Sequence, residues 1–272
     1  MQRTWFCRRF ELPGVEMMEV VDAQQPWRRV SAAYELLCCE TWRGELVCRG
    51  ARRRLEPGAL LWVGPGESFE MSGAGSFRVL SLEPELWRRA QAERGLSLTA
   101  RQLEPWLSST PGELGAELRR VLDELRADSA PSLEALFDAL ERELSGSNDA
   151  RRLPAHAAPV AVRLRELLLA DEEQTRDLEQ LAQGLGFSRF QLLRAFKRAY
   201  GLPPHTYVLC ARIAQAQRLL RLGQRPAYVA AELGFADQSH LTRHFKRLLR
   251  VTPSEYAQAT LSRPPRQRSI AG

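Results

Sequence analysis

Side chains able to bind nucleic acid recur at helical spacing between residues 237 and 250 of the chain. In a helix, Leu241, Phe245, Leu248 and Leu249 would form one buried stripe. The opposite face would present the polar and cationic residues Gln238, Ser239, Thr242, Arg243 and Lys246. Glutamine and arginine hydrogen-bond to base edges, and lysine and arginine pair with phosphates. This face therefore suits a helix that lies in the major groove of DNA.

The preceding residues have the features needed to position such a helix. Val229 and Leu233 place apolar groups on one face of a short helix, and Gly234 allows the sharp turn that follows. Asp237 can cap the second helix by accepting a hydrogen bond from an otherwise unpaired backbone N–H group. Residues 226–256 are therefore predicted to form a helix-turn-helix unit.

A second copy of this pattern lies 49 positions earlier in the chain. Ser188, with Gln191 three residues later, can form a capping box there. The only two lysines of the chain, Lys197 and Lys246, hold the same place in the two copies. Other matching pairs are Leu192 with Leu241, Arg194 with Arg243, Phe196 with Phe245, and Tyr207 with Tyr256. One helix with an arginine-rich solvated face needs no functional explanation, but two copies with matching caps, core and cations are poorly explained by chance.

The residues between the two copies predict a rigid connection. Residues 188–200 form the first recognition helix, which Gly201 closes, and Pro203 and Pro204 begin a helix that ends at Leu222. A helix of about 18 residues is roughly 27 Å long. With the units at its ends it can hold two recognition helices about 34 Å apart, which is one turn of duplex. We therefore expect both helices to enter successive major grooves on one face of double-stranded DNA.

Residues 160–259 resemble the DNA-binding domain of the AraC/XylS family of bacterial transcription regulators. The stretches that carry the resemblance are LAQGLGFSRFQLLRAFKRAYGLPPHTYVLCARIAQAQRLL and PAYVAAELGFADQSHLTRHFKRLLRVTPSEY. Before them, residues 160–170 should form an amphipathic helix, and Thr175 should cap a short helix that ends at Ala182. The chain departs from the family at Arg250, where a glycine is usual. A left-handed conformation there would cost a non-glycine residue about 1 kcal/mol, so we expect a strained helix end.

The two recognition helices supply the candidate DNA-binding residues. Because Leu192 and Phe196 face inward, the base-reading candidates of the first helix are Arg189, Phe190, Leu193 and Arg194. In the second helix, the resemblance assigns base reading to Gln238, Ser239, His240 and Arg243. The residues expected to hold phosphates are Thr242, Lys197, Arg198, Lys246 and Arg247. For His240, a purely structural role is an alternative.

Charge is divided unequally along the chain. Residues 151–272 contain 20 Lys and Arg against 9 Asp and Glu, whereas residues 1–150 contain 19 against 24. A genome that favours arginine explains the scarcity of lysine but not this division. Nucleic-acid binding is therefore expected of the C-terminal half alone. No apolar run approaches the length of a membrane span, so we expect a soluble cytoplasmic protein.

The chain has five cysteines, an odd number without metal-ligand spacing, which indicates reduced thiols. The adjacent pair Cys38 and Cys39 could act as a redox sensor. Neighbouring side chains on a strand point to opposite faces, so we expect instead one buried and one exposed thiol.

Residues 1–112 are predicted to form a β-barrel. Short apolar or alternating runs are separated by turn dipeptides at Arg43-Gly44, Arg49-Gly50, Pro57-Gly58, Pro65-Gly66 and Ser72-Gly73. Residues 53–71 resemble the cupin-like effector domain that many AraC-type regulators carry at the N-terminus. The interior of such a barrel is either filled by its own side chains or open to an apolar or aromatic effector. The tryptophans that could line such a cavity are Trp5, Trp27, Trp42, Trp62 and Trp87, although a core role is the more usual one for tryptophan.

A cupin barrel can also hold the metal of an oxygenase, and such sites need two or three histidines. The first histidine of this chain is His156, and Phe69 stands where related sequences often place a histidine. The β half also lacks a Ser-His-Asp or Cys-His set. We therefore predict no catalytic residue, no metal and no cofactor, and a cupin enzyme tethered to DNA is the least favoured alternative.

Two helical patterns follow the barrel, in residues 113–146. By the family resemblance this segment forms dimers, and the alternative is that both helices only cover the barrel. Residues 147–158 have the composition of a linker, which would let the DNA-binding half, residues 159–260, reorient. Residues 261–272 are predicted to be a disordered tail.

The sequence thus predicts an α+β chain. It consists of a cupin-like β-barrel with a two-helix segment, followed by an all-α domain with two helix-turn-helix units joined by a long helix. The leading functional hypothesis is a homodimeric, sequence-specific transcription regulator of the AraC/XylS type, an activator by family habit, which contacts RNA polymerase and responds to an effector. The alternative is a ligand-independent regulator whose barrel only dimerises or contacts RNA polymerase.

Overall fold

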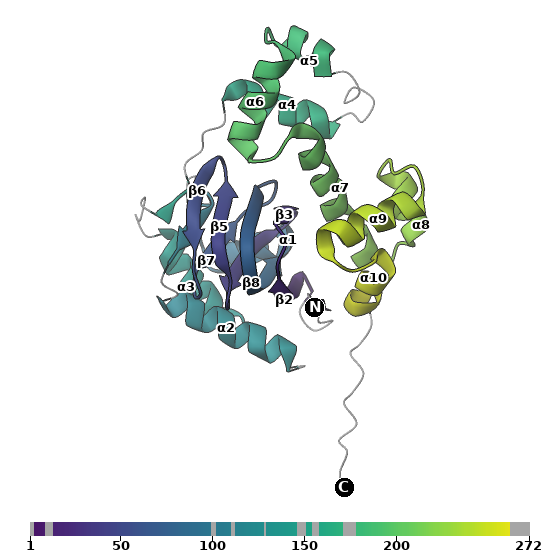
Figure 1. Ribbon diagram of the computed structural model, residues 1–272. Helices are drawn as coiled ribbons and strands as arrows, with labels where there is room; N and C mark the ends of the chain where they lie inside the picture. The colour runs from purple at the N-terminus through teal and green to yellow at the C-terminus, as the bar shows by residue number, and fades with distance from the viewer. Residues whose placement is uncertain are drawn as a thin grey trace.

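The computed structural model describes residues 3–8, 13–98, 102–109, 112–127, 129–145, 151–153, 158–170 and 178–261. An antiparallel β-barrel with helices on its outer face is followed by an all-helical part, as Figure 1 shows. The strands are β1 (Arg3–Arg8), β2 (Val15–Ala23), β3 (Trp27–Val30), β4 (Tyr34–Cys39), β5 (Arg43–Cys48), β6 (Ala51–Leu55), β7 (Leu60–Val63), β8 (Ser68–Leu82) and β9 (Trp106–Ser108). The helices that accompany them are α1 (Pro84–Glu93), α2 (Gly112–Arg126) and α3 (Glu134–Ser145). The predicted α+β class is confirmed.

Strand β8 is the central strand of the barrel. Its first half pairs with β3 and β5, and its second half pairs with β2 and β4, so one 15-residue strand belongs to both sides of the sheet. The predicted turns at Ser72-Gly73 and Arg43-Gly44 are wrong, because both dipeptides lie within paired strands. A Cβ atom on Gly44 would lie 1.9 Å from the carbonyl oxygen of Ser72, so these glycines permit close approach of two backbones.

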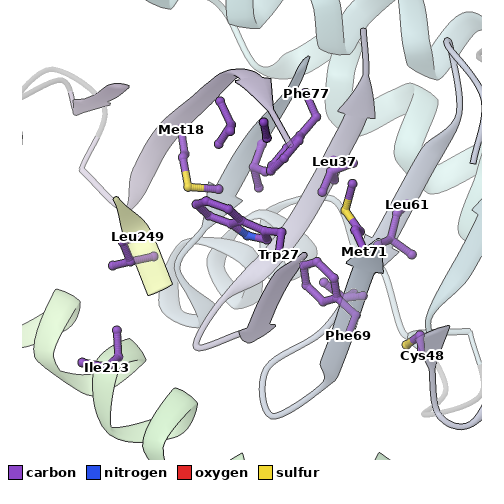
Figure 2. Packing of buried hydrophobic residues seen from close by; sticks show 14 of the residues in the cluster. Met18, Trp27, Leu37, Cys48, Leu61, Phe69, Met71, Phe77, Ile213 and Leu249 are labelled. Carbon is purple, nitrogen blue, oxygen red and sulfur yellow. The ribbon is translucent and has the colours of Figure 1, made fainter. Parts of the chain in front are cut away.

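The two faces of the sheet bury different sets of side chains. Met18, Trp27 and Phe77 belong to the inner cluster, which Figure 2 shows. Trp62 and Trp87 pack in a second cluster between the outer face and helices α1, α2 and α3. The core role is therefore confirmed for Trp62 and Trp87, and lining of the barrel cavity is excluded for these two. The side chain of Trp5 lies outside the described residues.

The helices predicted in residues 113–146 are α2 and α3, and both pack on the outer face of the sheet. Their apolar stripes are buried within this single chain. The stripes consist of Leu114, Leu118, Val121, Leu122, Leu125, Leu136, Phe137, Leu140 and Leu144. The alternative that both helices cover the barrel is therefore the one that the structure supports. Neither apolar stripe is left for a second subunit.

Cys38 and Cys39 are both buried, so the expectation of one exposed thiol is wrong. The two side chains do point to opposite faces: Cys39 belongs to the inner cluster and Cys38 to the outer one. Because helices cover the outer face, the outer side of β4 is shielded from solvent like the interior. Burial raises the pKa of Cys38 to about 11 and that of Cys39 to about 12.

The four described cysteine thiols should be unreactive in the folded protein. Cys38, Cys39, Cys48 and Cys210 are buried, and burial raises the pKa of each, so the reactive thiolate is scarce at neutral pH. In a Cys7→Ser background, a disulfide reagent at pH 7.5 should label none of the four before denaturation and all four after it. Rapid labelling of Cys38 or Cys39 in the native protein would contradict this and restore the redox-sensor hypothesis.

The C-terminal part contains the predicted paired helix-turn-helix arrangement. Its helices are α4 (Pro159–Ala170), α5 (Leu178–Gly184), α6 (Arg189–Tyr200), α7 (Pro204–Arg221), α8 (Pro226–Glu232), α9 (Gln238–Leu249) and α10 (Pro253–Leu261). The 18-residue α7 begins at Pro204 and separates the α5–α6 unit from the α8–α9 unit (Figure 1). The predicted cap Thr175 lies outside the described residues.

The helical part packs directly on the barrel. Ile213 of α7 and Leu249 of α9 belong to the same buried cluster as Met18 and Trp27 of the barrel (Figure 2). Residues 151–153 of the predicted linker also lie on the barrel, where the backbone N–H of Leu153 donates to Pro105 at 2.8 Å. Residues 147–150 and 154–157 of that linker, and the predicted tail beyond residue 261, lie outside the described residues.

Candidate nucleic-acid interface

The second recognition helix, α9, is fixed by its cap and by its buried stripe. The side chain of Asp237 accepts from the backbone N–H of His240 at 2.6 Å, as predicted for the N-cap. Leu241, Phe245 and Leu249 are buried against the rest of the domain. This burial fixes the rotation of the helix, so that its polar face points outward.

That polar face lines an open groove of about 720 Å³. The lining consists of Gln238, Ser239, Thr242, Arg243, Lys246, Arg247 and Arg250. It contains no acidic side chain, and four of its seven residues are cationic. Six of the predicted base-reading and phosphate-binding residues are thus brought together on one surface, and His240 is not among them.

His240 uses both ring nitrogens inside the protein. Its Nδ1 accepts from the backbone N–H of Ala236 at 3.3 Å, which assigns the ring proton to Nε2. Nε2 lies 2.8 Å from Nε2 of His244, one turn further along α9. The ring therefore ties the turn to the helix, which supports the structural alternative for His240 over base reading.

His244 is the acceptor in this pair, so its own proton lies on Nδ1. Burial, together with Arg247, His240 and Arg243, lowers the pKa of His244 below its ordinary value. The ring is therefore neutral at pH 7.

The first recognition helix, α6, has equally well-defined ends. Ser188 and Gln191 form the predicted capping box, and Gly201 closes the helix in the left-handed conformation with φ of 70°. Leu192 and Phe196 are buried. The predicted DNA-facing residues Arg189, Phe190, Arg194, Lys197 and Arg198 are exposed, whereas Leu193 is half-buried. Phe190 is 71% exposed, which is unusual for a phenylalanine without a partner surface.

Sequence reasoning missed the residues that fasten both units to the barrel. The hydroxyl of Tyr207 donates to the carbonyl oxygen of Gly66 at 2.9 Å, and that of Tyr256 donates to Glu16 at 2.6 Å. The two tyrosines occupy matching places in the two copies, so each unit contacts the barrel through an equivalent side chain. Their repetition was visible in the sequence, but their partners in the barrel were not.

The contact of Tyr256 belongs to a buried ion pair. Nη1 of Arg221, at the end of α7, donates to Glu16 of β2 at 2.9 Å and to the Tyr256 hydroxyl at 3.1 Å. Burial alone would lower the pKa of Arg221, but Tyr256 and Glu16 outweigh it and raise that pKa. Burial, with Glu16, also raises the pKa of Tyr256, so the hydroxyl keeps its proton. No feature of the sequence marked Glu16 or Arg221.

Arg250 ends α9 in the left-handed conformation, with φ of 65°, as expected for a position where glycine is usual. Its Nη2 donates to Oε1 of Gln25 in the β2–β3 turn at 2.7 Å. Arg250→Gly should be more stable than Arg250→Ala by about 1 kcal/mol, because both lose this contact and only alanine keeps the strained Cβ. Urea unfolding of the two variants measures the difference, and equal stability would contradict the strain.

Comparison with known proteins agrees with both parts of this structure. A family model described as an AraC-like ligand binding domain matches residues 18–152, and one described as a helix-turn-helix domain matches residues 181–259. The multiple antibiotic resistance protein MarA of Escherichia coli (strain K12) is 30% identical over 90 residues, which cover 33% of this chain and 71% of MarA. The chain belongs to the AraC family of transcription regulators.

Other AraC-type regulators are similar over more of the chain. The uncharacterized HTH-type transcriptional regulator YbfI of Bacillus subtilis (strain 168) is 28% identical over 210 residues, 72% of this chain and 74% of YbfI. The crystal structure of ToxT from Vibrio cholerae O395 shares the fold over 97% of this chain and 98% of its own, with a TM-score of 0.51 and 13% identity.

Membership of the AraC family makes this chain a DNA-binding transcription regulator with an N-terminal domain of the ligand-binding type. Within the described residues, His, Cys, Asp and Glu side chains form no group of three that could hold a metal ion. None of the described helices is long and apolar enough to cross a membrane.

Proposed function

We propose that α6 and α9 read one duplex in two successive major grooves. The observation that carries this proposal is the pairing of two capped helices, each with a buried stripe and an exposed polar face, at the ends of one rigid helix. Because both units are also fastened to the barrel, their spacing is set before DNA binds.

The side chains divide into base readers and phosphate holders. In α9, Gln238 and Arg243 have the hydrogen-bonding groups for adenine and guanine edges, and Lys246 lies further along the groove where it suits a phosphate. In α6, Arg194 can fork onto guanine and the exposed Phe190 can contact thymine methyl groups. The remaining candidates add contacts of the same two kinds.

We also propose that a small molecule in the barrel controls this DNA binding. Glu16, Ser81 and Glu35 are paired across β2, β8 and β4 on the inner face of the sheet. Oε1 of Glu16 and Oγ of Ser81 are buried without a hydrogen-bond partner among the described residues, and the Glu35 carboxylate pairs with Nη2 of Arg29 at 2.7 Å. Such atoms suit a ligand with hydrogen-bond donors. Glu16 also holds Arg221 and Tyr256 of the helical part. A ligand bound to the row formed by Glu16, Ser81 and Glu35 would therefore compete for these contacts and act directly on the DNA-binding part.

A ligand for this fold has a precedent in ToxT, which has been solved with an unsaturated fatty acid bound. The competing proposal is a barrel that only dimerises or contacts RNA polymerase. A thermal-shift screen with a metabolite panel separates the two, since a specific ligand must raise the melting temperature of the wild-type protein. A row variant, Glu35→Gln, should abolish that shift, and a panel without any stabilising compound favours the ligand-independent regulator.

The proposed function has five further parts: activation of transcription, contact with RNA polymerase, homodimerisation, a cytoplasmic location and the absence of catalysis. Any dimer must use a surface other than the apolar stripes of α2 and α3, because these are buried within one chain. Light scattering of the purified chain tests dimerisation.

Metal analysis of the same preparation tests the absence of catalysis. Stoichiometric iron or zinc would favour the alternative in which the barrel is an enzyme.

Genome-wide mapping of binding sites in the native host, combined with transcript levels in a deletion strain, tests the proposed function. We expect sites upstream of a small set of genes whose transcripts fall on deletion. Absence of specific sites would contradict sequence-specific regulation, and a rise of the transcripts would replace activation by repression.

A further inference from the structure

A second groove, of about 590 Å³, lies between the barrel and the DNA-binding part. One wall is formed by Gln25 and Arg28, at the β2–β3 turn and in β3 of the barrel, and the other by His205 of α7 and by residues of α9. Arg247 and Arg250 line both this groove and the DNA-facing groove of α9. The cationic surface of the recognition helix is therefore continuous with the edge of the barrel.

The groove presents hydrogen-bond donors and has no acidic lining residue among those described. Nδ1 of His244, which carries the ring proton, and Nε of Arg250 are buried atoms without a hydrogen-bond partner in the described part of the chain. Gln25 supplies a side-chain acceptor, and Nη2 of Arg250 already donates to it. A surface with this excess of donors is suited to an anion.

Arg28 is held in place to serve the same anion. It pairs across the sheet with Glu70, whose two carboxylate oxygens accept from Nε at 2.9 Å and from Nη2 at 3.1 Å. This fork fixes the guanidinium plane and leaves Nη1 for a further acceptor. The Arg28 side chain is 46% exposed, so a ligand can reach it.

We propose that the phosphate backbone flanking the site read by α9 runs through this groove, so that the barrel itself forms part of the DNA-binding surface. This inference rests on the proposed function, because it needs α9 in the major groove. DNA is favoured over a small anion because the groove continues the reading surface through Arg247 and Arg250 without a break. The barrel would then fix the register of α9 on DNA without reading bases.

The test compares Arg28→Ala with Arg54→Ala in the full-length protein, on an operator obtained by selection from random DNA. Arg54 is a matched control, since it is also a strand arginine in an ion pair, lies on β6 away from the groove, and is 85% exposed. Arg28→Ala should weaken binding about fivefold and reduce the slope of log K against log salt by about 1, whereas Arg54→Ala should change neither. The double variant Arg28→Ala/Glu70→Ala should keep the reduced slope, which shows that the loss is not caused by exposing Glu70.

A duplex shortened on the flank next to the α9 site should bind wild type and Arg28→Ala alike. Suppose that wild type, Arg28→Ala and Arg54→Ala bind the long duplex equally while Arg243→Ala still binds poorly. That result would overturn the role of the barrel in DNA binding and leave the proposed function of α9 intact. Tighter binding by Arg28→Ala would also overturn it, because the barrel would then obstruct DNA. If inorganic phosphate stabilised the wild type through Arg28 and DNA binding did not depend on that residue, the groove would hold a small anion instead. Failure of the wild type to bind any selected duplex would remove the proposed function as well.

Discussion

Replacing Arg221 with methionine should lower the free energy of unfolding by about 3 to 5 kcal/mol, because it leaves the buried carboxylate of Glu16 without its cation. The Arg221 side chain is 10% exposed and Glu16 only 5%, so water cannot replace the lost partner. Urea unfolding followed by tryptophan fluorescence measures the change, since five described tryptophans are buried in the barrel and beneath its helices.

Two further variants show whether the loss comes from the unpaired charge. Glu16→Gln/Arg221→Met removes both charges and should recover much of the stability. Arg120→Met is the matched control: Arg120 pairs with Glu117 and Glu124 on the surface of α2, and its loss should cost less than about 1 kcal/mol. Equal destabilisation by Arg221→Met and Arg120→Met would show that the contact between the barrel and α7 contributes no more to the free energy of unfolding than a surface ion pair does.

Replacing Arg243 with alanine should weaken specific DNA binding by about 1 to 3 kcal/mol, or roughly fivefold to more than a hundredfold, and relax the preference at one base pair. Arg243 is exposed and lines the α9 groove, and the buried neighbours Leu241 and Phe245 keep the helix in place without it. Fluorescence anisotropy with the selected operator and its single-base variants gives both quantities.

Lys246→Ala is the matched comparison from the same groove. A lysine on a phosphate carries no sequence information, so this variant should weaken all duplexes by the same factor and lower the salt dependence by about 1. If both variants bound the operator as the wild type does, α9 would not be a DNA-reading helix.

The helical half could be predicted from the sequence because its determinants are local. Ser188 with Gln191, Gly201 and Asp237 fix helix ends through neighbours at most four residues away. The apolar spacing around Leu241 repeats within one helix. Such signals need no knowledge of the rest of the chain, and all of them are present in the structure.

The parts that could not be predicted depend on contacts between distant residues. Gly73 has the same local appearance as a turn glycine, and only the approach of Gly44 across the sheet shows why it lies in a strand. Glu16 and Arg221 meet across 205 positions in the sequence. The position of His240 fits a base reader, whereas its ring nitrogens are engaged in contacts within the protein that spacing cannot reveal.

Guanine methylation interference on the selected operator tests most directly whether α6 and α9 lie in successive major grooves of one duplex. Wild-type protein should give two clusters of interfering guanines on one face of the DNA, about one helical turn apart. Arg194→Ala should remove interference in one cluster only, and Arg243→Ala in the other only. A single cluster, or loss of the same guanines in both variants, would show that the two helices do not read DNA side by side.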